Sequence, residues 1–165
     1  MTVRLCVVVI MRSIRALGFV CIILLKTVLG ANILYVAPLA SHSHYLWNKA
    51  LSLALVERGH NVTLVTHDTE KNATPENFTV ITLEGLYEVI NEYYNFEEAM
   101  HQTILSSIKS LYDYVKFSCA HDLNTKGLET LLNYPKDMFD LILYDVTSNQ
   151  CFYPLIKKFG NPPVV

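Results

Sequence analysis

Ile33-Leu34-Tyr35-Val36-Ala37 and Val62-Thr63-Leu64-Val65-Thr66 are the two stretches of sequence that decide the fold. Each is a short apolar run, the pattern of a strand buried on both faces of a parallel sheet. Between them, residues 46–58 carry apolar side chains at a spacing of three to four, which predicts a helix. Ser43 is its expected N-cap and Gly59 its expected end. Since a helix separates the two strands, they are predicted to lie parallel.

The rest of the chain extends the same pattern. Strands are predicted over residues 78–83 and 139–145, short helices over 122–134 and 152–159, and the opening of one more strand at 162–165. A long amphipathic helix is expected over 95–118, with its apolar stripe packed on the sheet rather than lying on a membrane surface. That stripe consists of Met100, Ile104, Leu105, Ile108, Leu111, Tyr112 and Val115. These elements predict an α/β fold, a Rossmann-like parallel sheet with helices on both faces, incomplete at its C-terminus.

Composition excludes several classes of protein. The formal net charge of -2 offers no electrostatic basis for binding nucleic acid. The polar segment after the first strand, Leu39 to Tyr45, has no glycine, which argues against a nicotinamide or flavin dinucleotide site. The cysteines and histidines lack the spacing of a zinc site, so no metal is expected. Cys119 and Cys151 could form one disulfide, but two buried thiols are the favoured interpretation.

Residues 1–30 are interpreted as a secretory signal peptide. Arg4, Arg12 and Arg15 precede or flank an apolar run over residues 16–25, and small residues lead up to Gly30. The alternative is a retained membrane anchor, which would require a longer apolar run of roughly 20 residues. Entry into the secretory pathway would expose three candidate N-glycosylation sites, Asn72, Asn77 and Asn61, of which Asn72 lies in the most polar segment.

Two polar positions follow predicted strands and are the candidates for chemistry. His44 lies in the polar segment after the first strand, and Asp145 ends the strand at 139–145. Ligands of open parallel sheets bind at the carboxyl ends of the strands, so the two side chains could meet there. An imidazole accepts a proton near neutral pH, and a carboxylate on its other nitrogen fixes the tautomer. A helix starting nearby would disfavour the imidazolium.

Two segments resemble the UDP-glycosyltransferase family, which includes glucuronosyltransferase-like enzymes. The first runs from Ser43-His44-Tyr45-Leu46-Trp47 to Glu57-Arg58-Gly59-His60-Asn61-Val62-Thr63, and the second is Phe139-Asp140-Leu141-Ile142-Leu143-Tyr144-Asp145. Cys119 with the leucines that follow it also resembles the family's pattern. The resemblance covers about residues 31–165 and identifies this part as the N-terminal acceptor-binding domain of a GT-B fold.

The resemblance implies a reaction and its residues. His44 would be the base that deprotonates an acceptor hydroxyl, with Asp145 as its partner, and Ser43, Tyr45 and His42 would line the acceptor pocket. The oxygen would attack the anomeric carbon of a UDP-sugar and displace UDP with inversion, transferring a hexosyl or glucuronosyl group to a small lipophilic acceptor. UDP-sugar is thus a co-substrate, and no other cofactor is expected.

The resemblance also leaves most of the enzyme outside this chain. The family's donor-binding domain and its membrane anchor in the endoplasmic reticulum would follow residue 165, so the isolated chain is expected to be inactive. It could pair with itself or with full-length transferases. The alternative function is a non-catalytic lumenal isoform that binds small lipophiles or regulates a transferase. His67, His101 and His121 are assigned to solvation or packing.

Overall fold

The computed structural model describes residues 30–93, 97, 101–147 and 150–165 of the 165-residue chain. Within it, Ala31–Val165 form one compact unit. All but the last residue of the expected signal peptide lies outside the described residues, so the signal peptide stays a prediction.

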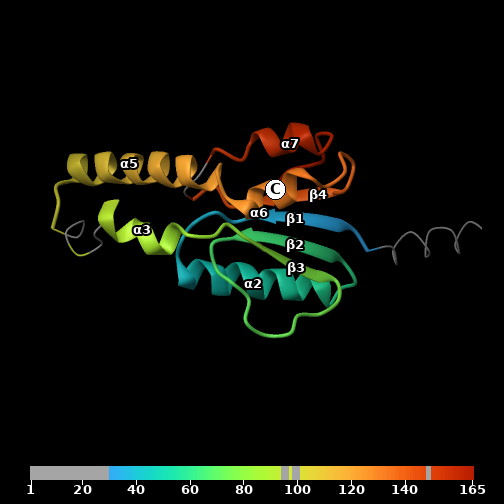
Figure 1. Ribbon diagram of the computed structural model, residues 1–165. Helices are drawn as coiled ribbons and strands as arrows, with labels where there is room; N and C mark the ends of the chain where they lie inside the picture. The colour runs from blue at the N-terminus through green and yellow to red at the C-terminus, as the bar shows by residue number, and fades with distance from the viewer. Residues whose placement is uncertain (1–29, 94–96, 98–100, 148–149) are drawn as a thin grey trace, which may run out of the picture. The chain divides into compact units, whose positions relative to one another are not determined.

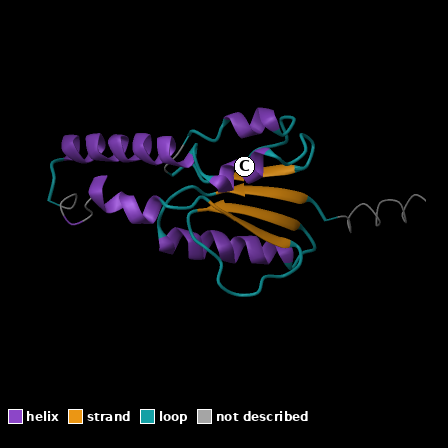
Figure 2. Ribbon diagram, in the orientation of Figure 1, coloured by secondary structure: helices purple, strands orange, loops and turns teal. Residues whose placement is uncertain are grey.

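The core of this unit is a parallel sheet of four strands (Figure 2). The strands are β1 (Asn32–Val36), β2 (Asn61–Thr66), β3 (Phe78–Thr82) and β4 (Leu141–Tyr144), in the spatial order β3-β2-β1-β4. Val164 adds a parallel bridge to Ile142, and the Val165 amide donates to the Ile142 carbonyl at 3.0 Å. The start of a further strand at 162–165 is therefore confirmed, as is the Rossmann-like parallel sheet.

Helices cover both faces of the sheet (Figure 1). They are α2 (His42–Val56), α3 (Leu86–Tyr93), α5 (Ile104–Asp122), α6 (Lys126–Leu132) and α7 (Pro154–Lys158). Successive residues of β1 alternate between the faces: Ile33 and Tyr35 pack with Val56 of α2, whereas Leu34 and Val36 belong to the core of the opposite face. Burial on both sides explains why the strands read as continuous apolar runs.

Helix α2 begins earlier than the sequence predicted. It starts at His42, and its N-cap is the extended residue Ser41 rather than Ser43. The prediction was wrong because it relied on apolar periodicity, and this periodicity begins only after the polar first turn. The helix ends at Val56, two residues before the predicted end at Arg58, and Gly59 adopts a left-handed φ of 88° in the turn that follows.

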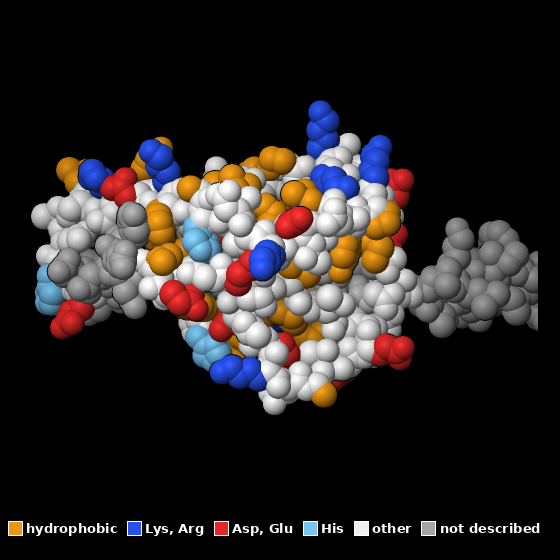
Figure 3. Space-filling view, in the orientation of Figure 1, with side chains coloured by type: hydrophobic (Ala, Val, Ile, Leu, Met, Phe, Trp, Pro, Cys, Tyr) orange, Lys and Arg blue, Asp and Glu red, His pale blue; other side chains and the backbone are white. Residues whose placement is uncertain are grey.

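The long amphipathic helix differs from the prediction in both position and packing. It is α5, Ile104–Asp122, and its apolar stripe is largely exposed: Leu105 is 81% and Tyr112 67% accessible. Only its later turns are buried, at Tyr114, Ser118 and Asp122. Figure 3 shows orange and charged side chains together over this helix. The predicted packing of this helix on the sheet is wrong for its first half, because α5 runs beyond the sheet in Figure 1. Met100 lies outside the described residues.

Cys119 and Cys151 form a disulfide, so the favoured prediction of two buried thiols was wrong. Cys119 lies in α5, and Cys151 lies shortly before α7. Their Cα atoms are 5.9 Å apart, within the range that a disulfide spans. The spacing of the two cysteines along the chain could not predict this bond, because the bond depends on where the end of α5 lies relative to the segment before α7.

Gly127 permits the close contact between α6 and β3. A Cβ atom at this buried position would lie 2.0 Å from the Thr82 carbonyl oxygen. Gly127→Ala is therefore expected to lower the free energy of unfolding by about 3 kcal/mol, the upper range for an overpacked site. Urea denaturation followed by circular dichroism would measure this loss.

Gly59→Ala is the matched control for that substitution. No atom lies within 4 Å of its added Cβ, so only the left-handed backbone is penalised, by about 1 kcal/mol. Equal losses in the two variants would contradict the steric explanation.

Candidate functional site

Two of the predicted residues meet at the carboxyl edge of the sheet. His44 lies in the first turn of α2, which follows β1, and Asp145 directly follows β4. Because β1 and β4 are adjacent and parallel, their carboxyl ends bring these residues together. His44 Nδ1 lies 3.8 Å from Asp145 Oδ2, an ion-pair distance that is longer than a hydrogen bond.

Asp145 is held in place by its neighbours. The Thr147 amide donates to Oδ1 at 2.9 Å, and the Thr147 hydroxyl donates to the same oxygen. The side-chain nitrogen Nδ2 of Asn48 donates to Oδ2 at 3.5 Å. Burial opposes ionisation, but the bonds from Thr147 and Asn48 and the nearby His44 outweigh it, so the pKa of Asp145 lies below its usual value. Asp145 is therefore a fixed carboxylate next to the imidazole.

Asn48 and Tyr35 were missed by the sequence analysis. Asn48 is buried. Its side-chain oxygen Oδ1 accepts from the Tyr35 hydroxyl at 2.7 Å, and its side-chain nitrogen Nδ2 donates to Asp145. Burial and the Asp145 charge raise the pKa of Tyr35, which stays a neutral donor. One signal was available, because Asn48 is a polar residue one helical turn after His44 and thus on the same side of α2.

A cavity of about 500 Å³ opens beside the pair. Its walls are aromatic and polar side chains: Tyr35, Ser43, His44, Trp47, Asn48, Tyr144, Asp145, Val146 and Thr147. The structure places the residues predicted to line one acceptor pocket in two separate cavities. Ser43 lines this cavity, whereas His42 and Tyr45 line a second one on another side of α2.

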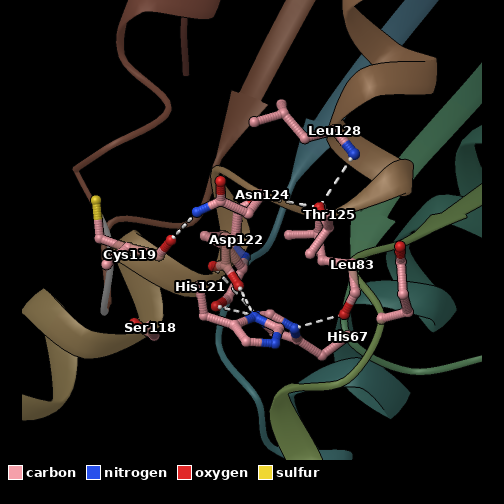
Figure 4. Close-up of polar contacts among 12 residues, drawn as sticks. His67, Leu83, Ser118, Cys119, His121, Asp122, Asn124, Thr125 and Leu128 are labelled. Atoms are coloured by element: carbon pink, nitrogen blue, oxygen red, sulfur yellow. Dashed lines mark hydrogen bonds and ion pairs between the residues drawn. The ribbon is translucent and has the colours of Figure 1, made fainter.

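Another His–Asp contact lies buried near the same edge (Figure 4). The side chains of His67 and Asp122 are both fully inaccessible, with Nε2 3.5 Å from Asp122 Oδ2. His67 Nε2 also lies 3.1 Å from the Pro38 carbonyl oxygen, and Nδ1 lies 2.9 Å from that of Leu83. Because all of these partners are acceptors, they favour a ring with protons on both nitrogens.

These contacts join four segments of the chain through His67 and favour the protonated form of its ring. Burial opposes its charge, but Asp122 and the carbonyls of Leu83 and Pro38 outweigh burial and raise the pKa of His67 above its usual value. His121 Nδ1 approaches the other carboxylate oxygen of Asp122 at 3.3 Å. The assignment of His67 and His121 to packing thus missed a buried ion pair, which sequence spacing could not reveal.

The three candidate glycosylation sites differ in their surroundings. Asn72 is exposed in the loop after β2. The Asn77 amide donates to the carbonyls of His60 at 2.9 Å and Val56 at 3.4 Å. The Asn61 amide donates to Asn32 Oδ1 at 3.0 Å. Asn61 and Asn72 are exposed, whereas Asn77 is half-buried.

Two features are absent from the described ranges of the chain. No group of three or more histidine, cysteine, aspartate or glutamate side chains is placed to hold a metal ion. Nor does any helix there combine the length and the apolar character that crossing a bilayer requires.

Comparison with known proteins gives one relative. Over 130 residues the chain is 32% identical to UDP-glucosyltransferase 2 of Dactylopius coccus, a match that covers 78% of this chain and 25% of that protein. No family model matches the chain, and no solved structure gives a significant match. The chain spans about a quarter of the length of the curated relative it matches. The comparison supports a relationship of this chain to the UDP-glycosyltransferases.

Proposed function

We propose that residues 31–165 form the acceptor-binding domain of a UDP-glycosyltransferase. The observation that carries the proposal is the pairing of His44 with Asp145 at 3.8 Å beside a cavity of about 500 Å³. The relative named UDP-glucosyltransferase supports a glycosyl transfer from a UDP-sugar. A small acceptor with a hydroxyl group would bind in the His44 cavity, with its apolar part against Trp47, Tyr144 and Val146.

In this proposal His44 is the general base. Its Nδ1 faces the Asp145 carboxylate, which leaves Nε2 to accept the proton of the acceptor hydroxyl. The acceptor oxygen then forms a bond to the anomeric carbon, and the bond from that carbon to UDP breaks with its electron pair leaving on UDP. Inversion follows from this single displacement. Asp145 stabilises the imidazolium that forms, and Asn48 and Tyr35 hold Asp145.

Trp47 provides a direct test, because it is the one tryptophan of the sequence and it lines the His44 cavity. A lipophilic phenol such as para-tert-butylphenol is expected to change its fluorescence on binding to the purified chain. His44→Gln removes the acceptor nitrogen of the imidazole and should weaken phenol binding by about tenfold, the value of one hydrogen bond.

Two controls sharpen this binding measurement. Tert-butylbenzene lacks the hydroxyl, so its affinity should be the same for the parent chain and for His44→Gln. His101→Gln changes an exposed histidine that does not line the cavity and should leave phenol binding unchanged. A phenol affinity that His44→Gln does not alter would remove His44 from acceptor binding.

We also propose that the chain enters the secretory pathway, as its first 30 residues and its exposed Asn72 suggest. In secreting cells Asn72→Gln is expected to remove a glycan and to increase electrophoretic mobility. Asn77→Gln should leave mobility unchanged, because the Asn77 amide is bound to two backbone carbonyls. A mobility that is insensitive to glycosidase in the parent chain would contradict this location.

A further inference from the structure

A second cavity, of about 490 Å³, borders the first turn of α2 and has no lining residue in common with the His44 cavity. Its side chains come from α2, from the loops after β2 and β3, and from α3. Those that matter most for its chemistry are His42, Tyr45, Lys49, Asp68, Glu70 and Tyr87. The proposed glycosyl transfer uses none of them.

His42 and Asp68 form a hydrogen-bonded pair in the wall of this cavity. His42 Nδ1 lies 2.7 Å from Asp68 Oδ1, a shorter contact than that between His44 and Asp145. Asp68 is fixed on its other side, since Oδ2 accepts from the Tyr87 hydroxyl at 2.9 Å. Its own carbonyl oxygen accepts from Thr82 Oγ1 at 3.1 Å. The carboxylate is thus held by side chains from two helices, α2 and α3, and the Thr82 hydroxyl fixes the backbone of Asp68.

This arrangement sets the tautomer of His42. A carboxylate accepts hydrogen bonds, so Nδ1 carries the proton and the lone pair lies on Nε2. The imidazole side chain is 70% exposed, whereas the Asp68 side chain is 10% exposed. A neutral His42 therefore offers an accessible acceptor nitrogen on a buried support, and its ligand must donate a hydrogen bond.

The charge of the cavity limits the ligand further. Lys49 is paired with Glu70, which also accepts from the Tyr45 hydroxyl at 2.7 Å. The Lys49 and Tyr45 bonds hold the pKa of Glu70 at about 2, so this carboxylate is ionised. Four carboxylates line the cavity, Asp68, Glu70, Glu84 and Glu88, against Lys49 and Lys71. His67 also lines it, but its inaccessible ring is paired with Asp122. The excess of negative charge disfavours anions such as nucleotide phosphates.

We propose that this cavity binds a small uncharged polyol such as a free monosaccharide. One ligand hydroxyl donates to His42 Nε2, and the others meet the carboxylate and hydroxyl oxygens of the walls. The rings of Tyr45 and Tyr87 supply flat apolar surface within the same cavity. The proposal stands apart from acceptor binding, because it concerns the other side of α2.

The test uses the purified chain, D-glucose as the probe, and NMR of the histidine side-chain nitrogens. Glucose is expected to shift the His42 Nε2 signal and to leave that of His44 unchanged. His42→Gln should weaken glucose binding by about tenfold, the value of one hydrogen bond. His44→Gln is the matched control in the same helical turn and should bind glucose like the parent chain.

Tyr87→Phe is a second variant that keeps the aromatic ring and removes one hydrogen bond to Asp68. It should weaken glucose binding about threefold, because the carboxylate is less firmly held. Glucose affinity unchanged in both His42→Gln and Tyr87→Phe would overturn the proposal. So would tenfold tighter binding of the cation glucosamine than of glucose, since it would show an ammonium site instead.

Discussion

Asp122→Asn is expected to lower the free energy of unfolding by about 3–5 kcal/mol, the cost of removing one partner of a buried ion pair. Asp122 and His67 are both fully inaccessible. The His67 ring keeps its two carbonyl partners in the variant, and both can only accept. The protonated ring would then be a buried charge without a counterion, and the neutral ring would leave one carbonyl unsatisfied. Urea denaturation followed by circular dichroism measures the loss.

Asp113→Asn is the matched control for this experiment. Asp113 also lies in α5 and also has a charged partner, Lys109 at 2.6 Å, but both side chains are more than half exposed. Such a pair is worth about 0.3–0.5 kcal/mol. A loss below 1 kcal/mol in Asp122→Asn would contradict the buried ion pair.

The same ion pair predicts how stability depends on pH. Because the pKa of His67 is raised in the folded state, the folded chain holds this proton more tightly than the unfolded chain. The contribution of His67 to stability is fully present below about pH 6.5, the usual histidine value, and is lost as the pH rises through the higher folded value. Asp122→Asn should flatten this decline, which unfolding curves at several pH values would show.

His44→Ala is expected to reduce glycosyl transfer by about 10²- to 10⁴-fold, the usual contribution of a general base. The measurement uses a chimera in which this chain replaces the matching quarter of the Dactylopius coccus relative. Transfer from UDP-glucose to para-tert-butylphenol would then be followed by chromatography. The loss should fall on kcat, because the imidazole acts as the proton moves.

His42→Ala is the control for catalysis, since His42 lines the other cavity. It should reduce transfer less than tenfold. Full activity in His44→Ala would remove His44 from the mechanism. Phenol binding without transfer by the parent chimera would instead favour the alternative of a non-catalytic lipophile-binding isoform.

The agreement between sequence and structure is best where local pattern determines the outcome. The apolar runs of β1, β2 and β4 and the left-handed Gly59 follow from neighbouring residues, because a doubly covered strand has no polar face. Agreement fails where an element projects beyond the sheet. The exposed stripe of α5 depends on which neighbours the fold provides, because a periodic pattern does not identify the surface that it packs against. The start of α2 was missed for a local reason, since its polar first turn has no apolar periodicity.

The sequence by itself determined the parallel α/β layout and the two candidate residues, His44 and Asp145. The tertiary structure decided which side chains meet: the Asn48 contact to Asp145, the pair of His42 with Asp68, the disulfide, and the buried contact of His67 with Asp122. The physical reason is that strand order and helix placement set distances between residues far apart in the chain. Hydrogen bonding and ionisation depend on those distances and on burial, neither of which is encoded in local spacing.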